Sequence, residues 1–279
     1  MSDPEIFARS LRRLRRDRAA PHYGAFAFLR EHMLEGIRER LEGVKREFRD
    51  VLDLGSFGGG FALPGARIAR LDSGFDFAKV AGGVQADEDR LPFADASFDL
   101  VISAGVLDQV NDVPGALALA RRVLRPDGLF LGAFVGAGTL AGLRGSFLAA
   151  EAERPAARFH PQIDVRSAGD LLGRAGFALP VADVETLTVR YGGIANLLRD
   201  LRGMAATNLL PDTRPLTREP LARAAQAFAE CADPDGRTPE RFEIVYLTGW
   251  APDASQPQPA RRGSATASLA DALKGPRPS

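Results

Sequence analysis

Residues 51–65, VLDLGSFGGGFALPG, carry the most informative pattern in the chain. A short apolar run ends in an acid at Asp53, and a turn dense in glycine follows it. Because glycine has no Cβ, such a turn lets backbone N–H groups approach a bound ligand closely. The segment is therefore predicted to be a buried strand followed by a ligand-binding loop.

Acids also end the next two predicted strands. The run ARIARLD ends at Asp72, and GGVQAD ends at Asp87 and is followed by Glu88. Ligands of open α/β sheets bind beyond the carboxyl ends of the strands, so we expect these acids to gather with Asp53 at one edge. Asp72 is placed to accept hydrogen bonds from two ribose hydroxyls, and Asp87 and Glu88 from an adenine amine. With no phosphate-binding lysine, the set suits a cationic or neutral nucleoside better than a dinucleotide.

Strand-like runs alternate with amphipathic segments through the middle of the chain, which predicts an α/β fold with a parallel sheet covered by helices on both faces. Residues 49–250 are expected to form this domain, with a helical insert at about 191–238. A helical arm over residues 1–48 precedes it. The tail over 251–279 is rich in proline and small residues and is linker-like in composition.

Element boundaries follow from the spacing of apolar residues. A helix is expected over residues 25–46, and the last two strands over about 183–189 and 241–250. Between the glycine loop and the second strand, residues 61–65 include Pro64. A parallel crossover needs about a dozen residues, so the helix expected at this point in the fold is reduced to one turn or is absent.

The N-terminal arm is unusually rich in arginine. Six arginines lie between Arg9 and Arg18, against one acid, Asp17, and apolar residues recur at helical spacing. This pattern favours a solvated helix face with one apolar edge packed on the body. Contact with an acidic partner surface is the alternative, and contact with nucleic acid or anionic lipid is a weaker one.

Composition limits the function classes. Lysine plus arginine and aspartate plus glutamate each number 36, so the net charge is zero, which argues against a protein that binds nucleic acid by bulk charge. No apolar run is long enough for a transmembrane helix. The single cysteine, Cys231, excludes an internal disulfide framework, and with the absence of a secretory signal it favours the cytoplasm.

At the level of whole motifs, the chain resembles the class I S-adenosylmethionine-dependent methyltransferases and, within them, the complex I assembly factor subfamily. That subfamily includes the mitochondrial arginine hydroxylase and its bacterial relatives. The segments that carry the resemblance are VLDLG, DEDRLPFADASFDLVIS, RRVLRPDGLFLGAF, FARSLRRLRRDRAA, VNDVPGAL, GTLAGLRGSFLAAEAER, DLLGRAGF, LLRDLRGMAATN and PARRGSATAS. The core is also similar to the malonyl-carrier-protein methyltransferase of biotin synthesis. Similarity to that enzyme does not account for the segment RRGSATAS.

The resemblance implies a Rossmann-like seven-stranded sheet, mostly parallel, with the last strand antiparallel and helices on both faces. It implies S-adenosylmethionine as cofactor and the modification of an arginine on a subunit of respiratory NADH:quinone oxidoreductase during assembly. Carried over residue by residue, the implied cofactor-binding positions are Asp53, Gly55, Gly59, Asp72, Asp87, Glu88 and Ser103. Ser103 would lie near the reacting end of the cofactor.

Two departures from the family pattern concern chemistry. Phe57 stands where the family loop has its central glycine, and its ring either turns outward or fills the pocket. Together with the short segment after the loop, it puts cofactor binding in doubt. Asp108 and Gln109 stand where many relatives have His-Trp. Asp108 is a candidate partner for a substrate guanidinium, because carboxylate–arginine pairing is strong and bidentate, and the alternative is a surface loop acid.

The sequence identifies no catalytic residue and no metal site. A non-haem iron site needs two histidines and a carboxylate, and His160 with Asp164 lacks a second histidine nearby. Three functions remain open. The chain modifies a protein arginine or assists complex I assembly, methylates a small acid or carrier-bound acyl group, or acts as a non-catalytic scaffold with a degenerate cofactor loop.

Overall fold

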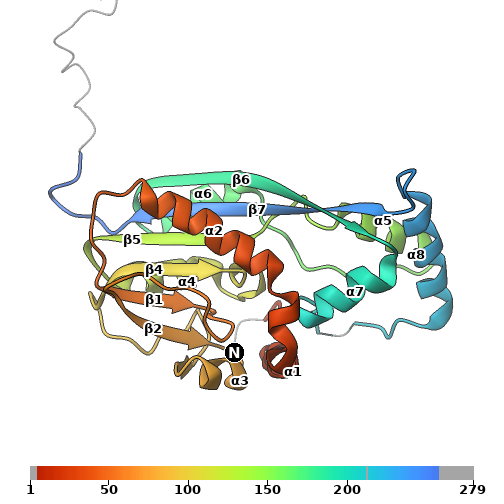
Figure 1. The fold of residues 1–279 in the computed structure, drawn as a ribbon, viewed down its shortest axis with the longest axis horizontal. Coiled ribbons are helices and arrows are strands. Elements are labelled where there is room, and N and C mark those ends of the chain that lie inside the picture. The colour runs from red at the N-terminus through yellow and green to blue at the C-terminus, as the bar shows by residue number, and fades with distance from the viewer. Residues whose placement is uncertain (1–4, 212, 258–279) are drawn as a thin grey trace, which may run out of the picture.

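A computed structural model describes residues 5–211 and 213–257, and its centre is one seven-stranded sheet (Figure 1). The strand order is β3-β2-β1-β4-β5-β7-β6, and β7 alone runs antiparallel to its neighbours. The strands are β1 Asp50–Leu54, β2 Arg67–Asp72, β3 Val84–Gln85, β4 Phe98–Ala104, β5 Leu124–Val135, β6 Ala178–Tyr191 and β7 Thr238–Trp250. The predicted fold class is confirmed.

Helices and helical turns flank the sheet. They are α1 Arg9–Ala19, η1 Ala20–Phe26, α2 Phe28–Glu42, α3 Phe75–Val80, η2 Leu107–Gln109, α4 Val113–Val123, α5 Ala141–Ala150, α6 Val165–Arg174, α7 Ile194–Gly203 and α8 Arg218–Glu230. Residues 55–66, between β1 and β2, contain no helix, as their length predicted. Within the described residues, no helix is both long enough and apolar enough to cross a membrane.

Two boundaries predicted from the sequence were wrong. The sixth strand is twice as long as expected because β6 pairs with β7 from Ala178 to Tyr191, and this long ribbon extends beyond the other strands (Figure 1). The helix expected over residues 25–46 begins only at Phe28, after a 3-10 segment that contains Pro21. The predicted tail lies outside the described residues from residue 258 onward.

The sheet separates two apolar cores. On one face, Met33, Leu34 and Ile37 of α2 pack with strand residues such as Ile102. On the other face, α4 and α6 cover the sheet. Burial of this much apolar surface fixes the strands, so their carboxyl ends form a rigid edge. Helix α1 lies at the arrowhead end of β1 and β2, beside α3 (Figure 1).

The packing of α2 gives a stability prediction. A Cβ at Gly36 would lie 2.4 Å from the hydroxyl oxygen of the buried Tyr246, whereas a Cβ at Gly145 in α5 would meet nothing within 4 Å. Gly36→Ala should therefore lower the free energy of unfolding by about 1–3 kcal/mol through overpacking. Gly145→Ala, the matched helical control, should raise it by about 0.5–1 kcal/mol. Urea denaturation measures both, and equal effects would contradict this packing.

Candidate functional site

The seven residues implied to bind the cofactor lie at one edge of the sheet. Asp53 is the penultimate residue of β1, and Asp72 is the last residue of β2. Asp87 and Glu88 follow β3 after one residue, Ala86. Ser103 of β4 lies opposite Leu54 of β1. Gly55 and Gly59 belong to the loop after β1. All five polar side chains are buried; the four acids pair with arginines of the protein, whereas the Oγ atom of Ser103 has no hydrogen-bond partner.

Asp72 is fully hydrogen-bonded by the chain. The Nε and Nη2 atoms of Arg16 in α1 donate to its two carboxylate oxygens over 2.8 and 2.5 Å. The backbone N–H of Phe57 donates to Oδ2 over 2.9 Å, and that of Gly74 to Oδ1 over 2.8 Å. A carboxylate has about four acceptor positions. Four donors therefore leave Asp72 no free position for ribose hydroxyls.

Arginines of α1 also pair with the acids after β3. Arg12 binds Glu88 in a bidentate pair, with N–O distances of 2.6 and 2.8 Å, and both side chains are buried. Arg13 donates to Asp87 over 2.7 Å. Arg12 lies four positions before Arg16 and Arg13 lies three positions before it, so one face of α1 presents guanidiniums to the acids at the end of β2 and after β3.

Arg9 extends the same face of α1. It forms a bidentate pair with Asp89, with N–O distances of 2.7 and 2.6 Å. The expectation that the arginines form a solvated face was therefore wrong for Arg9, Arg12 and Arg16. The spacing of apolar residues showed that one face of the helix is polar. It did not show that the acids at the edge of the sheet bind the arginines of that face.

Asp53 has a weaker partner. Arg30 of α2 lies 3.3 Å from both carboxylate oxygens, and it also donates to the backbone carbonyl of Gly59. Burial raises the pKa of Asp53 to about 6, although the charge of Arg30 acts in the opposite direction. The arm thus supplies guanidiniums to the tips of β1 and β2 and to the acids after β3.

The side chain of Phe57 fills the loop rather than turning outward. Its φ of 47° lies in the left-handed region, which bulky residues rarely adopt. The ring stacks on Tyr23 at a centroid distance of 4.9 Å, and the Arg16 guanidinium carbon lies 3.8 Å from its centroid. At Gly55, a Cβ would lie 2.2 Å from Val106, so a side chain already covers that glycine.

The residues at this edge have the donor and acceptor types expected for S-adenosylmethionine, but they do not fit it in this structure. The carboxylates implied for ribose and adenine are bound by arginines. The space beside the loop is taken by Phe57 and Val106. A nucleoside would have to displace the arginines of α1 from these acids.

A second site adjoins the first. Asp108 lies in η2, just after β4, and lines a cavity of about 330 Å³. The walls are largely apolar and include Leu29, Leu143 and Phe147. The Oδ1 atom of Asp108 is buried without a hydrogen-bond partner. A smaller gap of about 40 Å³ is lined by both Asp108 and Phe57, so the cavity and the cleft are neighbours.

The cavity wall carries one carboxylate, Asp108, and the guanidiniums of Arg15 and Arg158, which donate to the carbonyl of Asn208 and to Glu151 respectively. Burial raises the pKa of Asp108 to about 6, with only partial compensation from its own backbone N–H and from Arg12. His160, also on the wall, accepts a hydrogen bond from the backbone N–H of Leu209 through Nε2, and burial lowers its pKa to about 4. It is therefore neutral near pH 7 and adds no positive charge beside Asp108.

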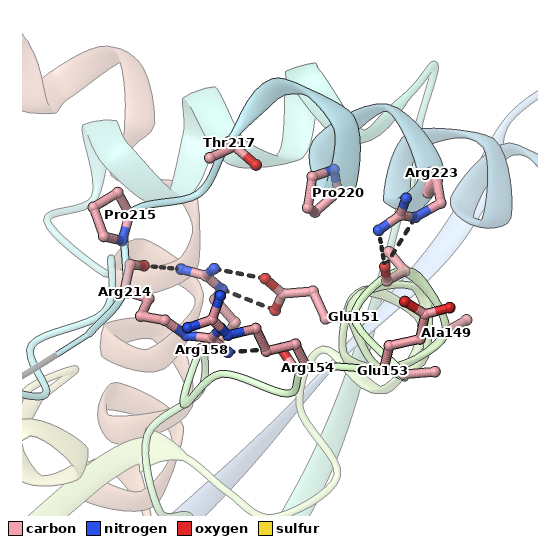
Figure 2. A pocket seen from close by; sticks show the side chains of 12 residues that line it. Ala149, Glu151, Glu153, Arg154, Arg158, Arg214, Pro215, Thr217, Pro220 and Arg223 are labelled. Atoms are coloured by element: carbon pink, nitrogen blue, oxygen red, sulfur yellow. Dashed lines mark hydrogen bonds and ion pairs between the residues drawn. The ribbon is translucent and has the colours of Figure 1, made fainter.

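A larger cavity, about 590 Å³, lies beside α5 and α8 (Figure 2). Three of its arginines already have partners. Arg158 forms a bidentate pair with Glu151, Arg214 donates to backbone carbonyls, and Arg223 donates to the carbonyl of Ala150. We therefore assign no ligand to it. Among the described residues, no group of three or more His, Cys, Asp or Glu side chains is placed to hold a metal ion.

Comparison with known proteins identifies the relatives. A family model described as "Methyltransferase domain" matches residues 52–132. The chain is 37% identical to arginine-hydroxylase NDUFAF5 of Danio rerio over 96% of its length and 90% of that protein. It is also 37% identical to the human NDUFAF5, over 95% of this chain and 83% of that protein. The chain belongs to the NDUFAF5 family.

More distant matches agree on the fold. The malonyl-[acyl-carrier protein] O-methyltransferase of Halorhodospira halophila is 34% identical over 84% of the chain and 85% of that enzyme. The YcgJ protein of Bacillus subtilis aligns with a TM-score of 0.56 at 16% identity, over 80% of this chain and 99% of that one. A SAM-dependent methyltransferase of Thermotoga maritima aligns with a TM-score of 0.50 at 18% identity, over 84% of this chain and 97% of that one.

Sequence reasoning missed several residues of this NDUFAF5-family site. The sequence patterns gave no role in the site to Arg30, Asp89, Tyr23 or Asn111. Asp112 is the N-cap of α4, while Asn111 binds the backbone of Phe7. The arm has more arginines than acids, and the strand ends have more acids than bases. This complementary excess was the signal that could have predicted the ion pairs between the two.

The raised pKa of Asp108 predicts a pH-dependent stability difference. A folded-state pKa of about 6, above the ordinary 3.8, means that the ionised carboxyl destabilises the fold above pH 6 and that this cost disappears as pH falls. Asp108→Asn should therefore be more stable than the wild type near pH 8, with the difference shrinking toward pH 5. Urea denaturation at both pH values measures it, and a pH-independent difference would contradict the assignment.

Proposed function

We propose that the chain acts on an arginine side chain of a partner protein, with Asp108 binding the guanidinium. The proposed activity is the one for which its relatives are named, arginine hydroxylation. As the sequence resemblance implies, the proposed partner is a subunit of respiratory NADH:quinone oxidoreductase. The cytoplasm remains the predicted compartment. The single observation that supports the substrate class is the unpartnered, buried carboxylate oxygen of Asp108 beside an apolar cavity.

The cavity suits the two parts of an arginine side chain. Leu29, Leu143 and Phe147 offer apolar contact to the methylene groups. The Asp108 carboxylate is the acceptor for the guanidinium, whose N–H fork matches a carboxylate. A volume of about 330 Å³ lies in the range of small-molecule pockets. A buried carboxylate without a partner is costly, and such costs are typical of functional sites.

Hydroxylation replaces a C–H bond of the arginine by C–OH. In the proposed reaction one oxygen atom of dioxygen enters the product and the other leaves as water, with two electrons and two protons from an external reductant. The role assigned to this chain is to hold the guanidinium. No residue is assigned to oxygen activation.

The acyl-methylating alternative is less well supported. The substrate in the name of those relatives is a malonyl group, which carries a carboxylate. Asp108 would repel a second carboxylate in a cavity of low dielectric constant. Of the two arginines on the same wall, Arg158 is paired with Glu151, and only Arg15, whose Nη1 already donates to the carbonyl of Asn208, would attract it. The scaffold alternative has a specific observation in its favour, because the acids implied for the cofactor are all paired with arginines. It predicts partner binding without modification.

Mass spectrometry of the complex I subunits tests the proposed activity. In the wild-type strain an arginine should carry the mass of one added oxygen atom, and deletion of the gene should remove it. Complementation with wild type should restore it, whereas Asp108→Asn should not, because the amide loses the negative charge.

Asp112→Asn is the matched control. It makes the same chemical change in the same loop, and asparagine caps a helix as well as aspartate does. It should restore the modification fully. An oxygen addition that survives gene deletion, or that Asp108→Asn restores, would refute the proposal. Loss of complex I assembly with no oxygen addition in the wild type would support the scaffold instead.

A further inference from the structure

Helix α1 places guanidiniums on the acids that were expected to bind a nucleoside. We propose that α1 is a tethered ligand of this edge of the sheet, which takes the place of the nucleoside and keeps free nucleosides out. This inference goes beyond the proposed function and does not depend on it, because it concerns the cleft and not the cavity at Asp108.

The chemistry of the contacts supports this substitution. Ribose would offer two hydroxyl donors to Asp72, and Arg16 offers two N–H donors to the same two oxygens. An adenine amine would donate to the acids after β3, and Arg12 donates there to both oxygens of Glu88. The Arg16 guanidinium also stacks on the Phe57 ring, a contact that a flat nucleobase makes with aromatic side chains.

The backbone is shaped for this close approach. A Cβ at Gly74 would lie 2.7 Å from the Cβ of Arg16, 3.1 Å from Oδ1 of Asp17 and 3.4 Å from Oδ1 of Asp72. Gly74 has an ordinary φ of −82°, so its conformation does not require glycine. The close approach of α1 does require it, because a larger residue would hold the helix away from the carboxylate.

Phe7 and Ala8, the two residues just before α1, are also anchored outside the cleft. Phe7 exchanges two hydrogen bonds with the side chain of Asn111, and the backbone N–H of Ala8 donates to the carbonyl of Leu209. These contacts keep the guanidiniums close to the acids, and a tethered group has a high effective concentration. A free nucleoside must compete with that concentration for carboxylates that are already saturated.

Ligand titration of the full-length wild-type protein is the first test. S-Adenosylhomocysteine at about 1 mM should leave the melting temperature unchanged, because a ligand that does not bind the folded state cannot stabilise it. Calorimetry should likewise give no binding heat. A dissociation constant below about 0.1 mM would overturn the proposal. The outcome is separate from arginine modification, which mass spectrometry follows.

Chemical rescue is the second test. Arg16→Ala should melt at a lower temperature, and methylguanidinium at about 50 mM should restore part of the loss by binding Asp72. Tetramethylammonium has the same charge but no N–H donors and should not. Arg18→Ala, on the exposed side of the same helix, is the control and should show neither loss nor rescue. Absence of rescue in folded Arg16→Ala would overturn the proposal.

A wedge variant covers the case in which Arg16→Ala does not fold. Gly74→Ala keeps every charge but should displace α1, so trypsin should cleave among the α1 arginines about tenfold faster than in the wild type. Gly24→Ala makes the same substitution in the 3-10 segment that follows α1, where a Cβ would meet nothing within 4 Å, and this control should be cleaved at the wild-type rate. Unchanged cleavage of Gly74→Ala would also overturn the proposal.

Discussion

The ion pair between Arg16 and Asp72 is the contact on which the form of the sheet edge depends. Both side chains are almost completely removed from solvent, at 1% and 0% exposure. A buried carboxylate without a partner is strongly destabilising, so the acids at the strand ends need either a ligand or a substitute supplied by the chain. Helix α1 is that substitute, and its contacts with Glu88 and Asp89 follow the same rule.

Asp108 stands in contrast to these acids. It lies at the same edge, after β4, yet its Oδ1 atom has no partner. The difference divides the edge into a closed part, where arginines neutralise the carboxylates, and an open part, where a carboxylate faces an apolar cavity. Arg15 of α1 lines that cavity while Arg16 pairs with Asp72, so one helix forms a wall of both parts.

Much of the fold was predictable from local patterns. The alternation of strands and helices, the acids at Asp53, Asp72 and Asp87 and the missing crossover helix are all visible in short windows of sequence. The confirmed sheet topology came from the family resemblance. Local patterns failed where pairing with a distant segment of the same chain sets the length of a strand. Strand β6 is long because β7 pairs with it from Ala178 to Tyr191.

The candidate site was harder to predict because its contacts join distant segments. Periodicity shows that α1 has a polar face, but Arg12 and Glu88 are 76 residues apart and only the fold brings them together. The inward position of Phe57 likewise depends on Tyr23 and Phe77, which form an apolar cluster with its ring. For Asp108, residue type suggested a guanidinium partner, while its burial and the cavity beside it required the structure.

A double-mutant cycle on Arg16 and Asp72 tests the central claim most directly. If the pair holds the edge closed, Arg16→Ala and Asp72→Ala should each cost about 3–5 kcal/mol in the free energy of unfolding. The double variant should then be more stable than the sum predicts by about 2 kcal/mol or more. Additive losses, with a coupling energy near zero, would contradict the claim that this pairing organises the cleft.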